Sequence, residues 1–338
     1  MAVRCIVVGA GGISDAWFPP LIEEEVEIAA VVDLRIEAAR AKVEQYHLQV
    51  EATSDLAAAL KKAKPEFVLD LTVPEAHREV TCAALEAGCH VIGEKPMASS
   101  MEEAREMVRT AERADKLYMV SQSRRWDPRH EAVRRALSAN AIGEITTINC
   151  DFYLGAHFGG FRDEMDSPLL LDMAIHHFDM ARMMAGADPV AVYAEEFNPK
   201  GSWYRGDVAA SCVFEMTEGI VFTYRGSWCA EGFHTSWNGD WRIIGSQGTL
   251  LYEHDEDPKA QLVAGDTGFH RPVNDVPVPV PELEATGIGM HGALREMLRF
   301  LRTGERPQTE CHDNIKSFAM CFAAIQSSKT GARVPVVA

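Results

Sequence analysis

The segment Cys5-Ile6-Val7-Val8-Gly9-Ala10-Gly11-Gly12-Ile13-Ser14 joins a short apolar run to a glycine-rich turn. The apolar run is typical of a buried β-strand. The turn has the pattern Gly-x-Gly-x-x-Ser, in which Ser14 takes the place of a third small residue. In such a turn the first glycine permits a tight bend, the second lets a pyrophosphate approach the backbone, and the third position lets the following helix pack closely. A glycine-rich turn alone is common, so the neighbouring sequence has to support this interpretation.

The sequence after this turn alternates between short apolar runs and helical patterns up to about residue 122. The further predicted strands cover residues 28–32, 67–71, 91–92 and 117–120, and the predicted helices cover residues 35–46, 56–62, 75–87 and 101–114. Gly88 stands where a helix C-cap glycine is expected, and Ser100 with Glu103 matches a capping box. Apolar strands separated by helices indicate an α/β fold, a doubly wound parallel sheet of the Rossmann type.

Asp33 lies at the end of the second predicted strand, where a carboxylate accepts hydrogen bonds from an adenosine ribose. Strand, glycine turn, helix, strand and acid thus follow one another in the order that dinucleotide binding requires. A carboxylate repels a 2′-phosphate, so Asp33 favours NAD. Arg35 leaves NADP as an alternative, because a guanidinium at that position pairs well with a phosphate.

The pattern changes after residue 122, where longer strand-like runs predominate. Predicted helices cover residues 128–139, 169–185, 292–302 and 313–329, and predicted strands cover residues 145–153, 190–197, 208–216, 220–228, 241–244 and 249–252. Residues 253–281 are acidic and then proline-rich, so we expect them to be irregular. The sequence therefore predicts two domains, 1–122 and 123–338, the second an α/β domain with a mainly antiparallel sheet and helices on one face.

Composition and charge exclude several classes of protein. The 338 residues contain 33 Lys and Arg against 50 Asp and Glu, a formal net charge of −17. Such a chain repels phosphate backbones and anionic lipids, so we expect neither a nucleic-acid nor a membrane partner. The eight cysteines are dispersed without a Cys-x-x-Cys pair, which favours reduced thiols in the cytoplasm over disulfides or a zinc site. We expect neither a secretion signal nor a membrane span.

Glu94-Lys95-Pro96 follows the fourth predicted strand. In open α/β sheets, ligands bind beyond the carboxyl ends of the strands, so Lys95 is well placed to donate to a substrate oxygen. The lysine would then lower the pKa of a reacting alcohol. The alternative is a loop ion pair between Glu94 and Lys95 with no chemical role.

The predicted helix over residues 169–185 is apolar except for a narrow polar stripe. Asp172, His176 and Asp179 are spaced i, i+4 and i+7, which places them on one helix face. Because the ordinary pKa of histidine is near neutral, His176 is a candidate general base, with Asp172 orienting its ring. The alternative is a solvent-facing stripe in which Asp179 pairs with Arg182. We expect no metal, since the adjacent His177 points away from His176 by about 100° on a helix.

Four separated segments together resemble the Gfo/Idh/MocA oxidoreductases, the glucose–fructose oxidoreductase and inositol dehydrogenase group. The matching segments are the glycine turn, Thr72-Val73-Pro74-Glu75-Ala76-His77, Ala87-Gly88-Cys89-His90-Val91-Ile92-Gly93-Glu94-Lys95-Pro96, and the Asp172-x-x-x-His176-x-x-Asp179 helix. Ser123–Pro128 and Ile244–Leu250 resemble further family segments, so that the resemblance spans nearly the whole chain. Val73 and Cys89 depart from the family pattern, and neither change removes a proposed catalytic group.

The resemblance implies a Rossmann domain and a second domain for substrate binding and oligomerisation, whose open sheet forms dimers or tetramers. It also implies bound NAD(P) and hydride transfer at a hydroxyl-bearing carbon of a sugar, polyol or related cyclic alcohol. By position, the implied catalytic residues are Lys95, Asp172 and His176. The implied cofactor contacts are Gly9, Gly11, Gly12, Ile13, Asp33, Leu34, Arg35, Thr72, Val73, Pro74, His77, Glu94 and Lys95. Candidate substrate contacts are Arg124, Arg125, Trp126, His157, Arg162 and His177, with Tyr204 and Trp237 as further cleft residues.

Two other functions fit the same scaffold. One is an NAD-dependent glycoside hydrolase or eliminase that oxidises its substrate only transiently, with no net reduction of NAD. The other is a non-catalytic regulator that senses NAD or a sugar. A regulator has no need to keep the lysine and the Asp–His pair together, and this chain has all three.

Overall fold

The computed structural model describes residues 2–282 and 287–338, which form two compact units. The first unit comprises residues 2–126 and 287–315, and the second comprises residues 127–282 and 316–338. The chain thus leaves the first unit near Trp126 and returns to it after the second sheet. The predicted domains, 1–122 and 123–338, did not anticipate this return.

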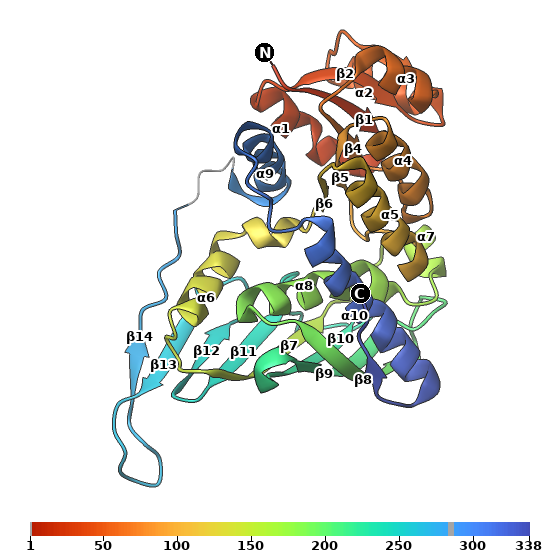
Figure 1. Ribbon diagram of the computed structural model, residues 1–338. Helices are drawn as coiled ribbons and strands as arrows, with labels where there is room; N and C mark the ends of the chain where they lie inside the picture. Colours follow the sequence, from red (N-terminus) through yellow and green to blue (C-terminus); the bar gives the residue numbers. More distant parts are fainter. Residues whose placement is uncertain (1, 283–286) are drawn as a thin grey trace. The chain divides into compact units, whose positions relative to one another are not determined.

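The first unit is built on a six-stranded parallel sheet with the strand order β3-β2-β1-β4-β5-β6, drawn in red to yellow in Figure 1. Its strands are β1 (Arg4–Val8), β2 (Glu27–Val32), β3 (Glu51–Thr53), β4 (Phe67–Asp70), β5 (His90–Gly93) and β6 (Tyr118–Val120). This order is that of a Rossmann fold, which confirms the predicted fold class. Sequence reasoning missed β3, because its three residues are polar or small and only partly covered.

Helices connect the parallel strands, and their ends follow capping rules. They are η1 (Gly12–Ala16), α1 (Phe18–Glu23), α2 (Ile36–Gln45), α3 (Leu56–Ala63), α4 (Pro74–Glu86) and α5 (Met101–Ala114). The Ser100 side chain accepts a hydrogen bond from the Glu103 amide at the start of α5, as the capping-box pattern predicts. Gly88 follows α4 with a φ of 88°, a conformation that glycine adopts without strain.

The returning segment completes the core of the first unit. After β6 the chain forms the short helix η2 (Ser123–Trp126), and the later helix α9 (Gly289–Thr303) packs against it. Trp126 shares one hydrophobic cluster with Leu294 and Met297 from α9 and with Trp17. A Cβ on Gly292 would lie 2.6 Å from Trp126 Cβ, so only glycine allows this approach of α9.

The second unit contains a nine-stranded sheet with the strand order β14-β13-β12-β11-β7-β10-β9-β8-β15. The strands are β7 (Ile145–Tyr153), β8 (Pro189–Phe197), β9 (Ala209–Met216), β10 (Val221–Ser227), β11 (Asp240–Gly245), β12 (Gly248–Tyr252), β13 (Lys259–Val263), β14 (Val273–Val276) and β15 (Val334–Pro335). All neighbours are antiparallel except β7 and β10, which makes the sheet mixed but mainly antiparallel. The segment expected to be irregular contains β13 and β14, so that expectation was wrong for these residues. Both are short strands, and between them only Ala260 is buried.

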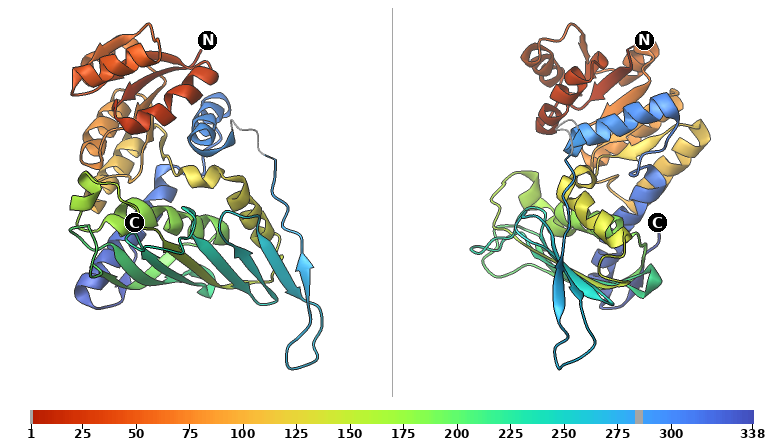
Figure 2. Two further views of the ribbon diagram at one scale, coloured as in Figure 1. Left: turned by 180° about the vertical axis from the view of Figure 1, so that it is seen from behind. Right: turned by 90° about the vertical axis from the view of Figure 1, so that its left-hand side faces the viewer.

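Helices cover one face of this sheet and leave the other open, as both views in Figure 2 show. They are α6 (Pro128–Ser138), the short α7 (Phe161–Glu164), the π-helical turn η3 (Leu169–Met173), α8 (Ala174–Ala185) and α10 (Cys311–Thr330). The open face carries exposed apolar side chains on neighbouring strands, namely Val190, Tyr193, Phe197, Val213, Val221 and Ile244. Among the described residues, no helix combines the length and the apolar character that crossing a bilayer requires.

Candidate active site

The glycine turn after β1 is fixed by close packing on one side and open on the other. Gly9 has a φ of 98°, and a Cβ there would lie 2.6 Å from both the carbonyl carbon and oxygen of Leu71. Only glycine therefore lets the turn approach the end of β4. At Gly11 a Cβ would meet no heavy atom within 4 Å. The backbone at this position is thus open to a ligand, as pyrophosphate binding requires.

Asp33 braces the same turn from the end of β2. Its Oδ2 accepts a hydrogen bond from the Ala10 amide, and its Oδ1 accepts one from the Arg35 amide, each over 2.8 Å. The Arg35 guanidinium extends into solvent, with Nε 3.8 Å from Asp33 Oδ1. Because each carboxylate oxygen has two lone pairs, Asp33 keeps acceptor capacity for a ribose hydroxyl.

A cavity of about 1300 Å³ opens beside this turn. It exceeds the roughly 300–1,000 Å³ typical of pockets for drug-sized ligands. Seven of the residues predicted to contact the cofactor line it: Gly9, Gly11, Asp33, Leu34, Arg35, Thr72 and Val73. The cavity and the open turn at Gly11 fit a dinucleotide. Sequence reasoning missed Ser54 and Leu56 on the same wall, because β3, which leads into them, was not predicted.

Gly12 and Ile13 lie exposed at the start of η1, next to Gly11, and Pro74 begins α4 directly after Val73. Their predicted contact with the cofactor stays a prediction. The other three predicted cofactor residues, His77, Glu94 and Lys95, lie around the carboxyl ends of β4 and β5.

Buried hydrogen bonds organise the carboxyl ends of β4 and β5. Asp70 is fully buried at the end of β4 and accepts hydrogen bonds from the Thr72 hydroxyl (2.6 Å) and the Thr81 hydroxyl (2.9 Å). Glu94, directly after β5, accepts one from Trp17 Nε1 over 2.8 Å. Burial raises the pKa of both carboxyl groups, and hydrogen bonds to the charged forms oppose this shift.

His77 is buried on α4 and contacts backbone instead of forming part of the cavity wall. Its Nδ1 lies 3.0 Å from the Pro96 carbonyl oxygen, and its Nε2 lies 3.0 Å from the Thr72 carbonyl oxygen. Lys95, the residue before Pro96, is only partly buried, in contrast to Glu94. After β5, Lys95 is therefore partly exposed and Glu94 is buried.

The predicted helix over residues 169–185 begins with a π-helical turn. Leu169–Met173 form this turn, and the α-helix begins at Ala174, after Met173 with φ −115° and ψ −53°. The helical segment thus spans the predicted residues, and Asp172 lies in its π-turn. That Asp172 and His176 share one face stays a prediction.

Asp172 is buried against an arginine that sequence reasoning assigned to substrate. Arg162 donates from Nε to Asp172 Oδ2 over 2.6 Å. The guanidinium also stacks over Phe158 and Phe161, with its carbon 5.0 and 4.6 Å from the two ring centres. The carboxylate therefore has a fixed position and a counter-charge.

Asp179 turns away from Asp172 and packs against α10. It accepts a hydrogen bond from the Ser317 hydroxyl over 2.7 Å and lies 3.9 Å from Arg182. Arg182 is itself buried and also forms an ion pair with Asp188 at 2.9 Å. The alternative interpretation predicted that Asp179 pairs with Arg182, and this pair is present. It also predicted that the stripe faces solvent, which is wrong here because both side chains are buried.

His176 keeps part of its surface exposed, whereas every other residue from Asp172 to Met184 is buried. His177 is fully buried among aromatic rings, 4.8 Å from Phe152 and 5.5 Å from Tyr224 between ring centres. Its Nε2 lies 3.4 Å from the Trp237 carbonyl oxygen. The two adjacent histidines thus have different environments, one accessible and one in the core of the second unit.

The other predicted substrate residues differ in accessibility. His157 is exposed, stacks on Trp203 at 3.7 Å, and lies 2.9 Å from Glu231. Tyr204 is buried and donates to the Ala156 carbonyl oxygen over 2.7 Å, and Trp237 is 45% exposed.

The predicted substrate residues after β6 are less accessible. Arg125 is buried and binds Asp313 at 2.7 Å and the Gln308 carbonyl at 2.9 Å, and Trp126 belongs to the core of the first unit. These two side chains support the fold, while Arg124 between Ser123 and Arg125 is only partly buried.

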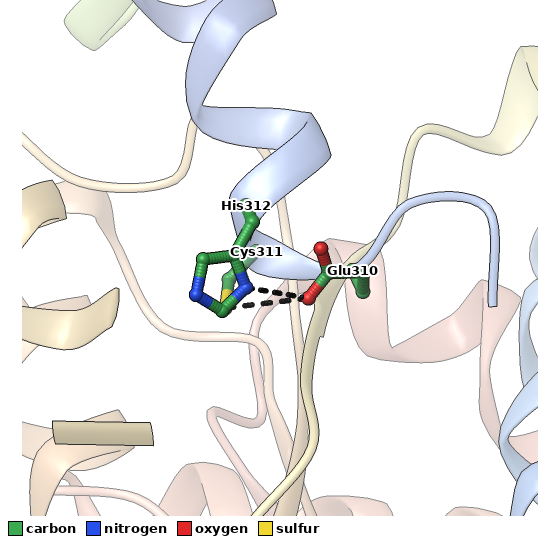
Figure 3. A group of neighbouring side chains, drawn as sticks. All are labelled: Glu310, Cys311 and His312. Atoms are coloured by element: carbon green, nitrogen blue, oxygen red, sulfur yellow. Dashed lines mark hydrogen bonds and ion pairs between the residues drawn. The ribbon is translucent and has the colours of Figure 1, made fainter. Parts of the chain in front are cut away.

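Figure 3 shows Glu310, Cys311 and His312, three potential metal ligands at the start of α10. His312 Nδ1 lies 2.8 Å from Glu310, and His312 Nε2 lies 2.9 Å from Glu112 on α5. The hydrogen bonds to these carboxylates raise the pKa of His312. Burial raises the pKa of Cys311 to about 12, so that its thiol is protonated at neutral pH. Hydrogen bonds to carboxylates account for the position of the His312 ring.

Two family models match the chain. Residues 3–122 match the model described as "Oxidoreductase family, NAD-binding Rossmann fold", and residues 130–251 match the GFO/IDH/MocA C-terminal domain. The chain belongs to the Gfo/Idh/MocA family of oxidoreductases. The resemblance seen in the sequence is thereby confirmed, as are a dehydrogenase function and NAD as cofactor.

Individual relatives are similar over nearly their full length. Inositol 2-dehydrogenase of Rhizobium meliloti is 26% identical, covering 97% of each chain. D-apiose dehydrogenase of Paraburkholderia graminis is 27% identical over 91% of this chain and 82% of its own. An Agrobacterium radiobacter oxidoreductase, crystallised with NAD+, L-tartaric acid and magnesium, superposes with a TM-score of 0.87 at 22% identity, covering 99% of each chain. That last likeness concerns the fold alone.

Proposed function

We propose that this protein is an NAD-dependent dehydrogenase that oxidises a hydroxyl-bearing carbon of a sugar, polyol or related cyclic alcohol. Its relatives named for inositol and D-apiose support this substrate class. Residues 1–122 would bind the cofactor, and residues 123–338 would bind the substrate. NAD, when bound, accepts the hydride, and the chain's own residues manage the proton.

His176 and Lys95 share the proton chemistry in this proposal. His176 accepts the hydroxyl proton through its imidazole during oxidation and returns it during reduction. Lys95 donates a hydrogen bond to the substrate oxygen, which stabilises the negative charge that develops there. Asp172, held by Arg162, orients the histidine and favours its protonated form.

The observation that carries the proposal is the accessibility of His176. Histidine is an acid–base group that ordinarily titrates near neutral pH. His176 keeps part of its surface exposed, whereas the other residues from Asp172 to Met184 are buried. The π-turn that contains Asp172 supports the same conclusion, because such turns are frequent at functional sites. A purely structural histidine would be buried, as His177 is.

The test is a panel of sugars and polyols assayed with NAD, for both NADH absorbance and product identity. We expect His176→Asn and Lys95→Met to lower turnover of the best substrate by about 10²- to 10⁴-fold, because each removes one proton-handling group. NAD affinity, measured by calorimetry, should change far less. His254→Asn and Lys259→Met are matched controls, since both side chains are exposed, in the turn after β12 and at the start of β13.

Three results would argue against the proposal. Near-normal turnover in both variants would refute the assigned roles. Product formation by bond cleavage without net NADH would identify the hydrolase or eliminase alternative. NAD binding without turnover of any substrate in the panel would favour a regulator.

We further infer that copies of this chain associate as a dimer or tetramer through the open face of the second sheet. Tyr193 is 52% exposed there and Val213 is 44% exposed, on the adjacent strands β8 and β9. Clustered apolar side chains on a sheet face indicate a contact surface. Light scattering should show an oligomer that Val213→Glu with Tyr193→Lys converts to a monomer. A wild-type monomer would contradict this inference.

A further inference from the structure

His77 occupies an unusual hydrogen-bonding position between two loops. Its Nδ1 and Nε2 face the carbonyl oxygens of Pro96 and Thr72, each over 3.0 Å. The ring is 1% exposed, so water does not replace either contact. Thr72 lies in the loop after β4 and lines the cavity, while Pro96 follows Lys95 in the loop after β5.

The two carbonyl oxygens belong to different loops, so the ring bridges them. A carbonyl oxygen can only accept a hydrogen bond, and a protonated ring nitrogen donates to the carbonyl that it faces. Losing this donor would be costly, because the contacts are buried.

Thr72 is itself anchored to the sheet. Its hydroxyl donates to Asp70 at the end of β4 over 2.6 Å, while its carbonyl oxygen faces His77. The ring therefore connects an anchored loop to the loop that carries Lys95.

We propose that His77 is a clamp that fastens the Thr72–Pro74 loop to the Glu94–Pro96 loop and so positions Lys95. His77 is a positioning residue, since it touches backbone and not the reacting atoms. The role of Lys95 in this statement rests on the proposed function, whereas the clamp itself does not. The clamp couples a wall of the nucleotide cavity to the lysine that handles the substrate oxygen.

The positioning effect is measured by hydrogen exchange on the two loops, which needs neither substrate nor activity. His77→Phe keeps an aromatic ring and loses both polar contacts, so the backbone amides of residues 72, 73, 95 and 97 should exchange at least about tenfold faster. Acetylation of Lys95, followed by mass spectrometry, should accelerate as well. His77→Gln, which keeps a donor, should lie between wild type and His77→Phe.

His90→Phe is the matched control. His90 is partly buried on β5 and accepts a hydrogen bond from the Leu117 amide, away from both loops. It should lower stability without changing exchange at residues 72–74 and 95–97. Equal exchange in wild type and His77→Phe would overturn the positioning role. Normal turnover of Lys95→Met would refute the proposed function of the lysine, while the exchange result would still establish or exclude the clamp.

Discussion

Arg162 on the short helix α7 donates from Nε to Asp172 in the π-turn over 2.6 Å. The side chain of Asp172 is 8% exposed and that of Arg162 is 31% exposed. The arginine therefore shields and neutralises the carboxylate that we assign to His176. It also ties a loop with exposed aromatic residues to the helix that carries the proposed base.

Removing this arginine should harm both stability and turnover. Arg162→Met leaves Asp172 buried without this guanidinium, and we expect a loss of about 1–3 kcal/mol in the free energy of unfolding. Turnover should fall because Asp172 loses its fixed orientation. Thermal unfolding and steady-state kinetics measure the two effects.

Arg333→Gln is the control for this loss. Arg333 pairs with Glu215 at 2.6 Å, but both side chains are more than half exposed. Exposed pairs contribute about 0–1 kcal/mol, so this variant should resemble wild type in both measurements. An Arg162→Met protein as stable as Arg333→Gln would show that the buried pair does not stabilise the π-turn.

The two glycines of the nucleotide turn should respond differently to alanine. Gly9→Ala places a Cβ 2.6 Å from the Leu71 backbone in a left-handed conformation, so we expect a loss of more than about 2 kcal/mol of stability. Gly11→Ala meets no protein atom and should fold normally, yet bind NAD at least tenfold more weakly, by about 1.4 kcal/mol. Circular dichroism and calorimetry distinguish these outcomes; normal NAD affinity in Gly11→Ala would place the pyrophosphate elsewhere.

Cofactor preference should depend on Asp33. Asp33→Ser removes the carboxylate that repels a 2′-phosphate and leaves the exposed Arg35 guanidinium to bind it. We expect the ratio of NADP to NAD affinity to rise by at least about tenfold, or 1.4 kcal/mol. The Ala10 amide loses its acceptor in this variant, so some stability should be lost too. An unchanged affinity ratio would contradict a ribose contact at Asp33.

Stability should depend on pH through His312. Hydrogen bonds to Glu310 and Glu112 raise the pKa of this histidine above its unfolded value of about 6.5. Its contribution is therefore fully present below that value and is lost as the pH rises through the folded-state pKa. The effect should be small, because the side chain is 45% exposed. His312→Gln should flatten the pH profile of denaturant unfolding above about pH 6.5, and an unchanged slope would refute this linkage.

The first unit was largely predictable because its signals are local. A buried parallel strand needs a continuous apolar run, and a tight turn needs Gly9, so composition and order along the chain determine the type of each element. The helix over 101–114 was predicted with its observed ends, since Ser100 and Glu103 mark its start. The strand at 51–53 escaped, because a short edge strand needs no apolar residues.

The site was less predictable because its contacts join distant segments. Asp179 and Ser317 are 138 positions apart in the sequence, so the spacing of residues along one helix cannot predict their hydrogen bond. The π-turn at Leu169–Met173 was not predicted, because its sequence continues a helical repeat that looks regular. His77 matched a family motif, yet the position of its two acceptors depends on loops 72–74 and 94–96 meeting in space.

The late return of residues 287–315 to the first unit has a consequence for synthesis on the ribosome. Leu294 and Met297 fill the cluster around Trp17 and Trp126, so the nucleotide-binding half lacks part of its interior until most of the chain has been translated. The usual order, in which the amino-terminal half folds first, cannot run to completion here. A nascent chain halted after Trp126 would expose an apolar patch that chaperones recognise. Strands β7 to β14 of the second sheet are all synthesised before the first unit receives α9.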